Sequence, residues 1–329
     1  MTWLTWRQFR MPALSVFAGL LVIAVVLAIT GPDLVGRTNF TDQDTLFVGT
    51  ILALYLLPAV IGVFWGVPMI TRELESGTHS LVWNQTVTRK RWLATKLGFG
   101  LLAAMVAAGL LGWAVSWWAS PIDALSAVDT DRGAMARIAP AVFGARGIVP
   151  IGYAAFALVL GVAAGMVLKR TVAAMAVTLV TLAAVLILVP NFVRPYLLPP
   201  QTETVAITGE NITNITGDET GDILEIGMRH QPGTWVLANE TVDPAGNVVS
   251  PLPNFVQTCV PRPGRDAGPP PHGSLEACMA QLGTHGYQQR LTFQPGSRFW
   301  PLQWLELALY LAMTALLTWF CFRRLRHLS

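Results

Sequence analysis

The stretch Ile148-Val-Pro-Ile-Gly-Tyr-Ala-Ala-Phe-Ala-Leu-Val-Leu-Gly-Val-Ala-Ala-Gly-Met-Val-Leu168 contains no charged side chain. A helix needs about 20 apolar residues to cross the hydrocarbon core of a bilayer. Buried strands of soluble proteins are much shorter than this run. The stretch therefore predicts a membrane-spanning helix, and it sets the fold class of the chain.

Five further stretches of similar length also lack Lys, Arg, Asp and His. They are Ala13–Thr30, Leu46–Ile70, Leu97–Trp118, Val172–Pro190 and Pro301–Phe322. Only 12% of the 329 residues are charged, about half the share in soluble domains, and the mean hydropathy is +0.51. The sequence predicts an all-α polytopic membrane protein with six transmembrane helices, located in the plasma membrane.

The basic residues between the predicted spans indicate the orientation. With six spans, both termini lie on one side, and that side holds 12 of the 22 Lys and Arg residues but only Glu73 and Glu75 of the acidic ones. Basic residues concentrate in cytoplasmic segments. We therefore expect both termini in the cytoplasm, and we expect this basic face to contact anionic lipid of the bilayer rather than nucleic acid.

Four segments follow from these boundaries. Residues 1–12 contain Trp3, Trp6 and two arginines, which favours an interfacial N-terminal helix. Residues 13–190 hold transmembrane helices 1–5, with a cytoplasmic loop at 71–96. Residues 191–299 are rich in Pro and Gly and contain short alternating runs, which predicts a small mixed α/β extracytoplasmic domain. Residues 300–329 form transmembrane helix 6 and a basic cytoplasmic tail.

Cys259 and Cys278 are the two cysteines outside the predicted spans. On an oxidising side of the membrane they are expected to form a disulfide, which the chain-entropy model values at roughly 3 kcal/mol. A metal site with His272 or His285 lacks the usual ligand spacing. Cys321 lies inside the last span and is expected to behave as a small apolar side chain.

The sequence contains no recognisable catalytic constellation, metal site or phosphate-binding loop. Glu306 is the single carboxylate within a predicted span, and two uses of it remain open. It either pairs with a neighbouring span or reaches the interface, or it forms a polar contact at the mouth of a translocation path. Pro58 should bend the second span, and a bent helix can line a moving path.

Two Gly-x-x-x-Gly patterns, at Gly62–Gly66 and Gly161–Gly165, allow helices to approach closely. The partner of each pattern is either another helix of this chain or a second chain.

The cytoplasmic loop between the second and third spans has an unusual composition. An acidic turn at Glu73 and Glu75 is followed by a break at Gly77-Thr78, and then by the apolar strip Leu81-Val-Trp83. Thr88 is placed to cap the next helix. A plain connector needs neither the acidic turn nor the apolar strip, and the strip is typical of a surface that contacts another protein.

This loop, with its pattern R-E-x-E-x-G-T, then L, then x-T-R-x-R-W-x-x-x-K, resembles the loop after the second span of ABC-2 type transporter permeases, in particular actinobacterial members. The ending from Gln294 to Glu306 and the segments Arg146–Pro150 and Leu168–Thr171 resemble the same family. The resemblance covers the whole chain in layout.

The resemblance implies that the loop docks on a separate cytoplasmic ATPase subunit. The residues that it places at this contact are Arg72, Glu73, Glu75, Gly77, Thr78, Leu81, Trp83, Arg89 and Arg91. It implies further that two permease chains, identical or sister chains, enclose the path. The importer loop pattern is absent, which favours export. This chain would bind no cofactor itself, because ATP-Mg would bind to the ATPase.

Two other classes of function compete with a non-enzymatic permease subunit. The first is a membrane-anchored receptor or assembly factor that acts through the extracytoplasmic domain. The second is a membrane enzyme, which the missing acid–base groups disfavour. A receptor needs neither six spans nor a coupling loop, so the sequence favours the permease.

Overall fold

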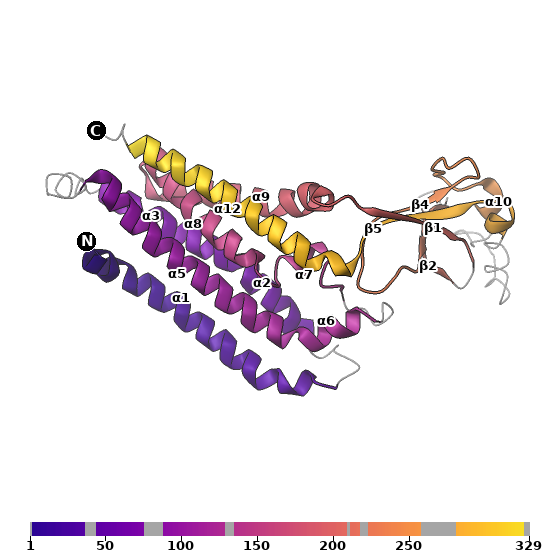
Figure 1. Cartoon of the computed structure of the whole chain (residues 1–329), viewed down its shortest axis with the longest axis horizontal. Helices are drawn as coiled ribbons and strands as arrows, with labels where there is room; N and C mark the ends of the chain where they lie inside the picture. Colours follow the sequence, from indigo (N-terminus) through magenta and orange to yellow (C-terminus); the bar gives the residue numbers. More distant parts are fainter. Residues whose placement is uncertain are drawn as a thin grey trace, which may run out of the picture. The chain divides into compact units, whose positions relative to one another are not determined.

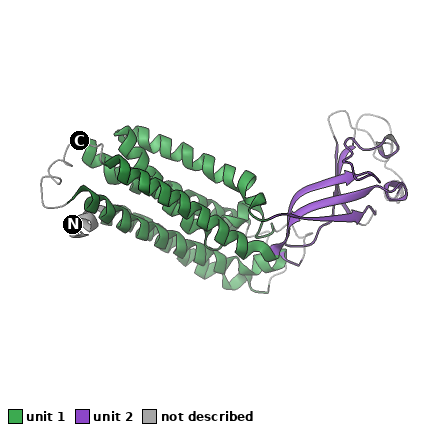
Figure 2. Ribbon diagram, turned by 45° about the horizontal axis from the view of Figure 1, so that its top comes forward, with its two compact units in different colours: residues 1–126, 131–198, 297–329 green, residues 127–130, 199–296 purple. Residues whose placement is uncertain are grey.

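The computed structural model describes residues 2–36, 44–75, 88–128, 135–208, 211–217, 223–257 and 281–325. The chain divides into two compact units (Figure 2). Unit 1 comprises Met1–Ser126, Asp131–Leu198 and Ser297–Ser329, and unit 2 comprises Ala127–Thr130 and Pro199–Gly296.

Unit 1 is a helix bundle in which the beginning of α1 and the end of α12 lie at the same end (Figure 1). Six of its described helices are long and apolar enough to span a membrane, as predicted. They are built from α1 (Thr2–Thr30), α2 (Asp44–Val60) with η3 (Ile61–Gly66) and α3 (Val67–Glu75), α5 (Arg89–Trp118), α8 (Val149–Leu168), α9 (Thr171–Leu188) with η4 (Val189–Val193) and η5 (Arg194–Tyr196), and α12 (Phe299–Arg324). Short helices η1 (Pro32–Leu34), α6 (Ser120–Ser126), α7 (Pro140–Phe143) and η7 (Gly296–Arg298) lie between them.

Helix α8, formed by the uncharged stretch that begins at Ile148, lies at the centre of the bundle. Of its 20 residues, 17 are buried. A helix that is apolar all round is suited either to the centre of a bundle or to contact with lipid, and α8 takes the first of these places. Helices α2, α3, α5, α9 and α12 all pack against α8. By contrast, α1 leaves large apolar side chains such as Leu21 and Ile29 exposed, as expected of a helix at the lipid boundary.

The two Gly-x-x-x-Gly patterns pack against each other inside this chain. A Cβ atom on Gly62 would lie 2.8 Å from the carbonyl oxygen of Ala157. A Cβ atom on Gly66 would overlap with the carbonyl oxygen of Leu158, and one on Gly161 would overlap with that of Gly62. The backbones of η3 and α8 therefore touch, and only glycine fits at the crossing.

The second span is irregular at this crossing. Its middle part, η3, is a π-helix, and Pro58 and Pro68 lie on either side of it. Proline lacks the N–H group that would donate to the carbonyl four residues earlier, so both prolines interrupt the regular ladder. The predicted bend of this span thus takes the form of a π-helical turn, a feature frequent at functional sites.

Two helices extend beyond the limits expected from the sequence. Helix α1 runs without a break from Thr2 to Thr30 and includes Pro12, and the interfacial position of residues 1–12 stays a prediction. The fifth span does not end at Pro190, because the helix continues as η4 and η5 to Tyr196. Pro190 lies near the start of the π-helical turn η4.

Unit 2 contains the strands β1 (Gln201–Ala206), β2 (Ile212–Gly217), β3 (Ile223–Met228), β4 (Trp235–Val242) and β5 (Gln288–Gln294), and the short helix α10 (Asn254–Gln257). An antiparallel sheet has the order β1-β5-β4, and β2 pairs with β3 in a second one. The predicted small region with strands after the fifth span is confirmed, and Ile226, Val256 and Leu282 contribute to its apolar core.

We predict that Gly66→Ala and Gly161→Ala lower the thermal stability of the purified chain in detergent. Overpacking of a tight contact costs about 1–3 kcal/mol, and neither backbone can move without displacing the other. The matched control is Gly98→Ala on α5, where an added Cβ meets nothing within 4 Å. Equal melting temperatures for the three variants would contradict the glycine crossing.

Candidate functional site

Two clusters of polar side chains among the described residues of unit 1 contain predicted site residues, and they lie near opposite ends of the bundle. A further buried salt bridge joins Arg146 to Asp123. One cluster joins the end of α3 to the beginnings of α5 and α9. The other joins the end of α9 to the beginning of α12. The first contains the described residues of the predicted coupling loop, and the second contains Glu306.

In the first cluster, Glu73 on α3 forms a salt bridge with Lys96 on α5. The ammonium group of Lys96 also donates to the carbonyl oxygen of Met69, at 3.1 Å, and it lies 4.8 Å from the centre of the Trp92 ring. The side chain of Lys96 is 6% exposed and that of Glu73 is 15% exposed. This salt bridge therefore joins α3 to α5, and both of its charged groups are largely shielded from solvent.

Glu75, the last residue of α3, binds the first turn of α9. Its carboxylate accepts hydrogen bonds from the backbone N–H of Thr171, at 2.7 Å, and from the Thr171 hydroxyl, at 2.9 Å. That hydroxyl also lies 2.7 Å from the hydroxyl of Thr71. A carboxylate is stabilised at a helix N-terminus because the exposed N–H groups there carry partial positive charge.

The predicted coupling residues therefore fall into three groups. Arg72, Glu73 and Glu75 form the end of α3, but the two carboxylates bind groups of this chain. Arg89 and Arg91 lie in the first turn of α5, and Thr88 caps that helix as predicted, accepting from the N–H of Arg91 at 3.3 Å. Gly77, Thr78, Leu81 and Trp83 lie outside the described residues.

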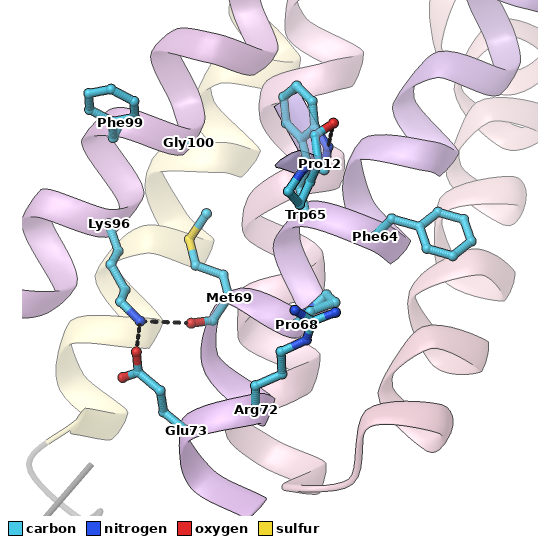
Figure 3. Close-up of a pocket in the computed structure, with 10 residues that line it drawn as sticks. All are labelled: Pro12, Phe64, Trp65, Pro68, Met69, Arg72, Glu73, Lys96, Phe99 and Gly100. Atoms are coloured by element: carbon cyan, nitrogen blue, oxygen red, sulfur yellow. Dashed lines mark hydrogen bonds and ion pairs between the residues drawn. The ribbon is translucent and has the colours of Figure 1, made fainter. Parts of the chain in front are cut away.

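A pocket of about 250 Å³ lies beside the first cluster, between α1, the second span and α5 (Figure 3). Its lining changes character along its length. Arg72, Glu73 and Lys96 lie toward one end, and aromatic side chains lie toward the other. The full lining set is Pro12, Phe64, Trp65, Pro68, Met69, Arg72, Glu73, Lys96, Phe99 and Gly100. The indole N–H of Trp65 donates to the carbonyl oxygen of Pro12, at 3.2 Å, and links the second span to α1.

In the second cluster, Glu306 on α12 forms a two-pronged salt bridge with Arg194 of η5. The Nη2 atom of Arg194 donates to Oε1 of Glu306 at 3.0 Å, and its Nε atom donates to Oε2. The Tyr153 hydroxyl of α8 donates to Oε1 at 2.8 Å. The side chains of Arg194 and Glu306 are completely buried.

The remaining groups of Arg194 also find partners. Its Nη1 atom donates to the carbonyl oxygen of Pro140, at 3.1 Å, and the guanidinium carbon lies 4.2 Å from the centre of the Phe143 ring. Two uses of Glu306 were left open by the sequence. In the structure Glu306 pairs with the fifth span, through Arg194. Its predicted contact with cargo is not tested by this pairing and stays a prediction.

Sequence reasoning missed Arg194 and Lys96 because both lie just beyond the limits set for the uncharged spans. The apolar residues Phe192 and Val193 follow Pro190, and from them the continuation of the fifth span could have been predicted. Reasoning from the sequence also missed Gln303, whose side chain is buried in α12. Its Oε1 atom accepts hydrogen bonds from the N–H groups of Ile148 and Val149, at 2.9 and 3.0 Å, and so caps the start of α8.

Pro58 is buried in α2, and its proposed place on a path stays a prediction. The predicted disulfide between Cys259 and Cys278 falls outside the described residues and also stays a prediction. Cys321 is buried among apolar side chains that include Trp92 and Leu93.

A family model described as "ABC-2 membrane transporter related" matches residues 30–194. This range contains the second, third and fourth spans, the fifth span up to Arg194, and the segment between α3 and α5. No curated protein matches the chain. No solved structure matches it either. Together with the six apolar helices, the family match identifies a multi-pass membrane protein.

We predict that Glu306→Gln strongly destabilises unit 1. Removing one partner of a buried pair leaves the other charge uncompensated, at a cost of about 3–5 kcal/mol. The measurement is unfolding of the purified protein in mixed detergent micelles. The matched control, Glu240→Gln in unit 2, breaks the partly exposed pair of Glu240 with Arg290, for which about 0–1 kcal/mol is expected.

The double variant Glu306→Gln/Arg194→Gln distinguishes charge pairing from packing. It should be more stable than Glu306→Gln alone, because no unpaired charge remains buried. If the changes in the free energy of unfolding caused by the two substitutions are additive, the salt bridge does not contribute the stability assigned to it.

Proposed function

Because the chain belongs to the ABC-2 membrane transporter related family, we propose that it is the permease subunit of an ATP-driven exporter. In this proposal the bundle forms the translocation path and carries out no chemistry. A separate cytoplasmic subunit binds and hydrolyses ATP-Mg, and a second permease chain completes the path. The family match is the observation that carries the proposal.

The contacts at the end of α3 support a coupling role for the segment at 76–87. This segment connects α3 to α5, and the salt bridge of Glu73 with Lys96 joins the same two helices. Glu75, at the end of α3, binds the backbone N–H of Thr171 and so connects the beginning of α9 to these two helices. A force applied to the segment would therefore act on three helices together, as rigid-body alternating access requires.

The structure changes the choice of residues with which to test docking. Glu73 and Glu75 bind groups of this chain, so their substitution would loosen the bundle whether or not an ATPase docks there. Leu81 and Trp83 are the better choice, because the apolar strip is the part of the segment for which a partner surface was predicted from the sequence. Buried tryptophans are frequent hot spots of protein interfaces.

The orientation in the membrane is part of the same proposal. The cluster of Glu73 and Lys96 would lie at the cytoplasmic face, next to the ATPase. Arg194 and Glu306 would lie toward the outer face and hold the ends of α9 and α12 together. Unit 2 follows η5 in the chain and would be extracytoplasmic, where it could accept, select or release cargo.

We predict that Leu81→Ala/Trp83→Ala reduces the amount of ATPase that co-purifies with the chain by about tenfold or more, since loss of a hot spot costs about 2 kcal/mol or more. The chain is purified from its own host in mild detergent, and the ATPase is quantified by mass spectrometry. The matched control is Trp304→Ala, which removes a tryptophan that is 61% exposed on α12.

Both variants should elute from size-exclusion chromatography like the unchanged chain, so that a loss of ATPase cannot come from misfolding. Equal recovery of the ATPase with both variants would contradict docking through the strip. If no protein with a phosphate-binding loop is recovered even with the unchanged chain, the transporter proposal fails and the receptor alternative gains support.

A further inference from the structure

We propose that the pocket between α1, the second span and α5 binds an anionic phospholipid of the bilayer, with the phosphate at Arg72 and the upper part of an acyl chain between the aromatic side chains. This site does not depend on the proposed export function. Four features of the pocket support the assignment: its depth, its charge, its opening and its size.

The depth of the lining residues matches the length of one lipid leaflet. Lys96 lies seven residues after the first residue of α5, and Phe99 lies ten residues after it. At 1.5 Å per residue these positions are about 10 and 15 Å from the helix end. Phe64 lies 11 residues before the last residue of α3, about 16 Å away. Because the hydrocarbon core is about 30 Å thick, the pocket runs from the headgroup level toward the midplane.

The charge at the shallow end favours an anion. Two cations, Arg72 and Lys96, and one carboxylate, Glu73, line the pocket, which leaves one positive charge in excess. Lys96 binds Glu73 and the Met69 carbonyl oxygen. Arg72 is an exposed residue, so its guanidinium group is accessible from the surroundings of the bundle. Arg10 and the exposed first turn of α5, with Arg89 and Arg91, make the same end of the bundle basic. Guanidinium groups bind phosphate through paired hydrogen bonds.

The deep end is apolar and open to the surroundings of the bundle. Phe64 lines the pocket and is 59% exposed, although it lies well within a candidate span. Phe99 and Gly100 line the α5 side, and the methyl end of Met69 packs directly against the backbone of Gly100, where a side chain would collide with it. An acyl chain can therefore enter from the lipid without crossing the bundle.

The volume also fits a partly enclosed lipid. About 250 Å³ is slightly below the roughly 300–1,000 Å³ of sites that enclose a small molecule. The pocket therefore takes the headgroup and the beginning of one chain, while the remaining lipid stays in the bilayer. A free anion would use only the charged end and would leave the aromatic wall without a role.

Binding is tested on the purified full chain by native mass spectrometry. The chain is titrated with phosphatidylglycerol and with phosphatidylcholine that carries the same acyl chains. Both lipids offer a phosphate to Arg72, but the quaternary ammonium group of phosphatidylcholine cancels its charge and repels the basic end of the pocket. We therefore expect phosphatidylglycerol to bind about tenfold more tightly. Arg72→Gln should abolish this preference. The matched control Arg10→Gln removes the same charge from an exposed position of the same bundle end and should retain it.

A second pair of variants tests the apolar part of the pocket. Phe99→Ala should weaken the binding of both lipids severalfold, whereas Leu102→Ala, which shortens a 65% exposed side chain on the same helix, should leave it unchanged. Melting temperatures are measured for all four variants so that unfolding is not mistaken for loss of binding.

Three results would overturn the proposal. Equal affinity of the unchanged chain for the two lipids would exclude recognition of an anionic headgroup. If Arg72→Gln and Arg10→Gln reduce the preference for phosphatidylglycerol equally, the lipid responds only to the general basic charge of this end of the bundle. Displacement of phosphatidylglycerol by an equal concentration of glycerol 3-phosphate would show that the site takes a soluble anion. None of these results bears on the ATPase partner.

Discussion

The crossing of η3 and α8 at Gly62, Gly66 and Gly161 constrains the rest of unit 1. In lipid, helices gain little from burying apolar side chains against one another, so close packing and polar contacts determine how they associate. At this crossing the two backbones touch. The burial of α8 follows from it, because the second span can approach α8 this closely only where side chains are absent.

Polar contacts then hold the remaining helices to this pair. Gln303 of α12 caps the start of α8, and Glu75 of α3 caps the start of α9. In each case an acceptor from one helix satisfies the free N–H groups of another. The buried pair of Arg194 and Glu306 closes the opposite end of α9 against α12. The bundle is thus tied at both ends around a tightly packed centre, which favours motion of unit 1 as one body over sliding of single helices.

The sequence predicted the features that depend on local composition. Six long apolar runs without Lys, Arg, Asp or His form six helices, Thr88 caps α5, and the alternating runs in unit 2 form strands. It did not predict contacts between distant residues. Arg194 and Lys96 looked like flanking charges, because a charge next to a span and a charge paired within the bundle have the same local sequence.

The two carboxylates of the coupling loop illustrate the same limit. Glu73 and Glu75 read as an exposed acidic turn, because nothing in the sequence places Lys96 or Thr171 beside them. The glycine patterns were recognised, but their partner was left open between this chain and a second one. Only the three-dimensional arrangement shows that they pack against each other, and only the order β1-β5-β4 shows how the strands of unit 2 pair.

The proposed coupling requires that the end of α3 and the beginnings of α5 and α9 move as one body when an ATPase acts on the segment at 76–87. Spin labels at Lys90→Cys and Arg170→Cys, exposed residues at the beginnings of α5 and α9, would measure this in a chain whose native cysteines have been replaced. Double electron–electron resonance is recorded on the assembled transporter with and without ATP. The account predicts an unchanged distance within each chain and a changed distance between the two permease chains. A change within the chain as large as the change between chains would contradict it.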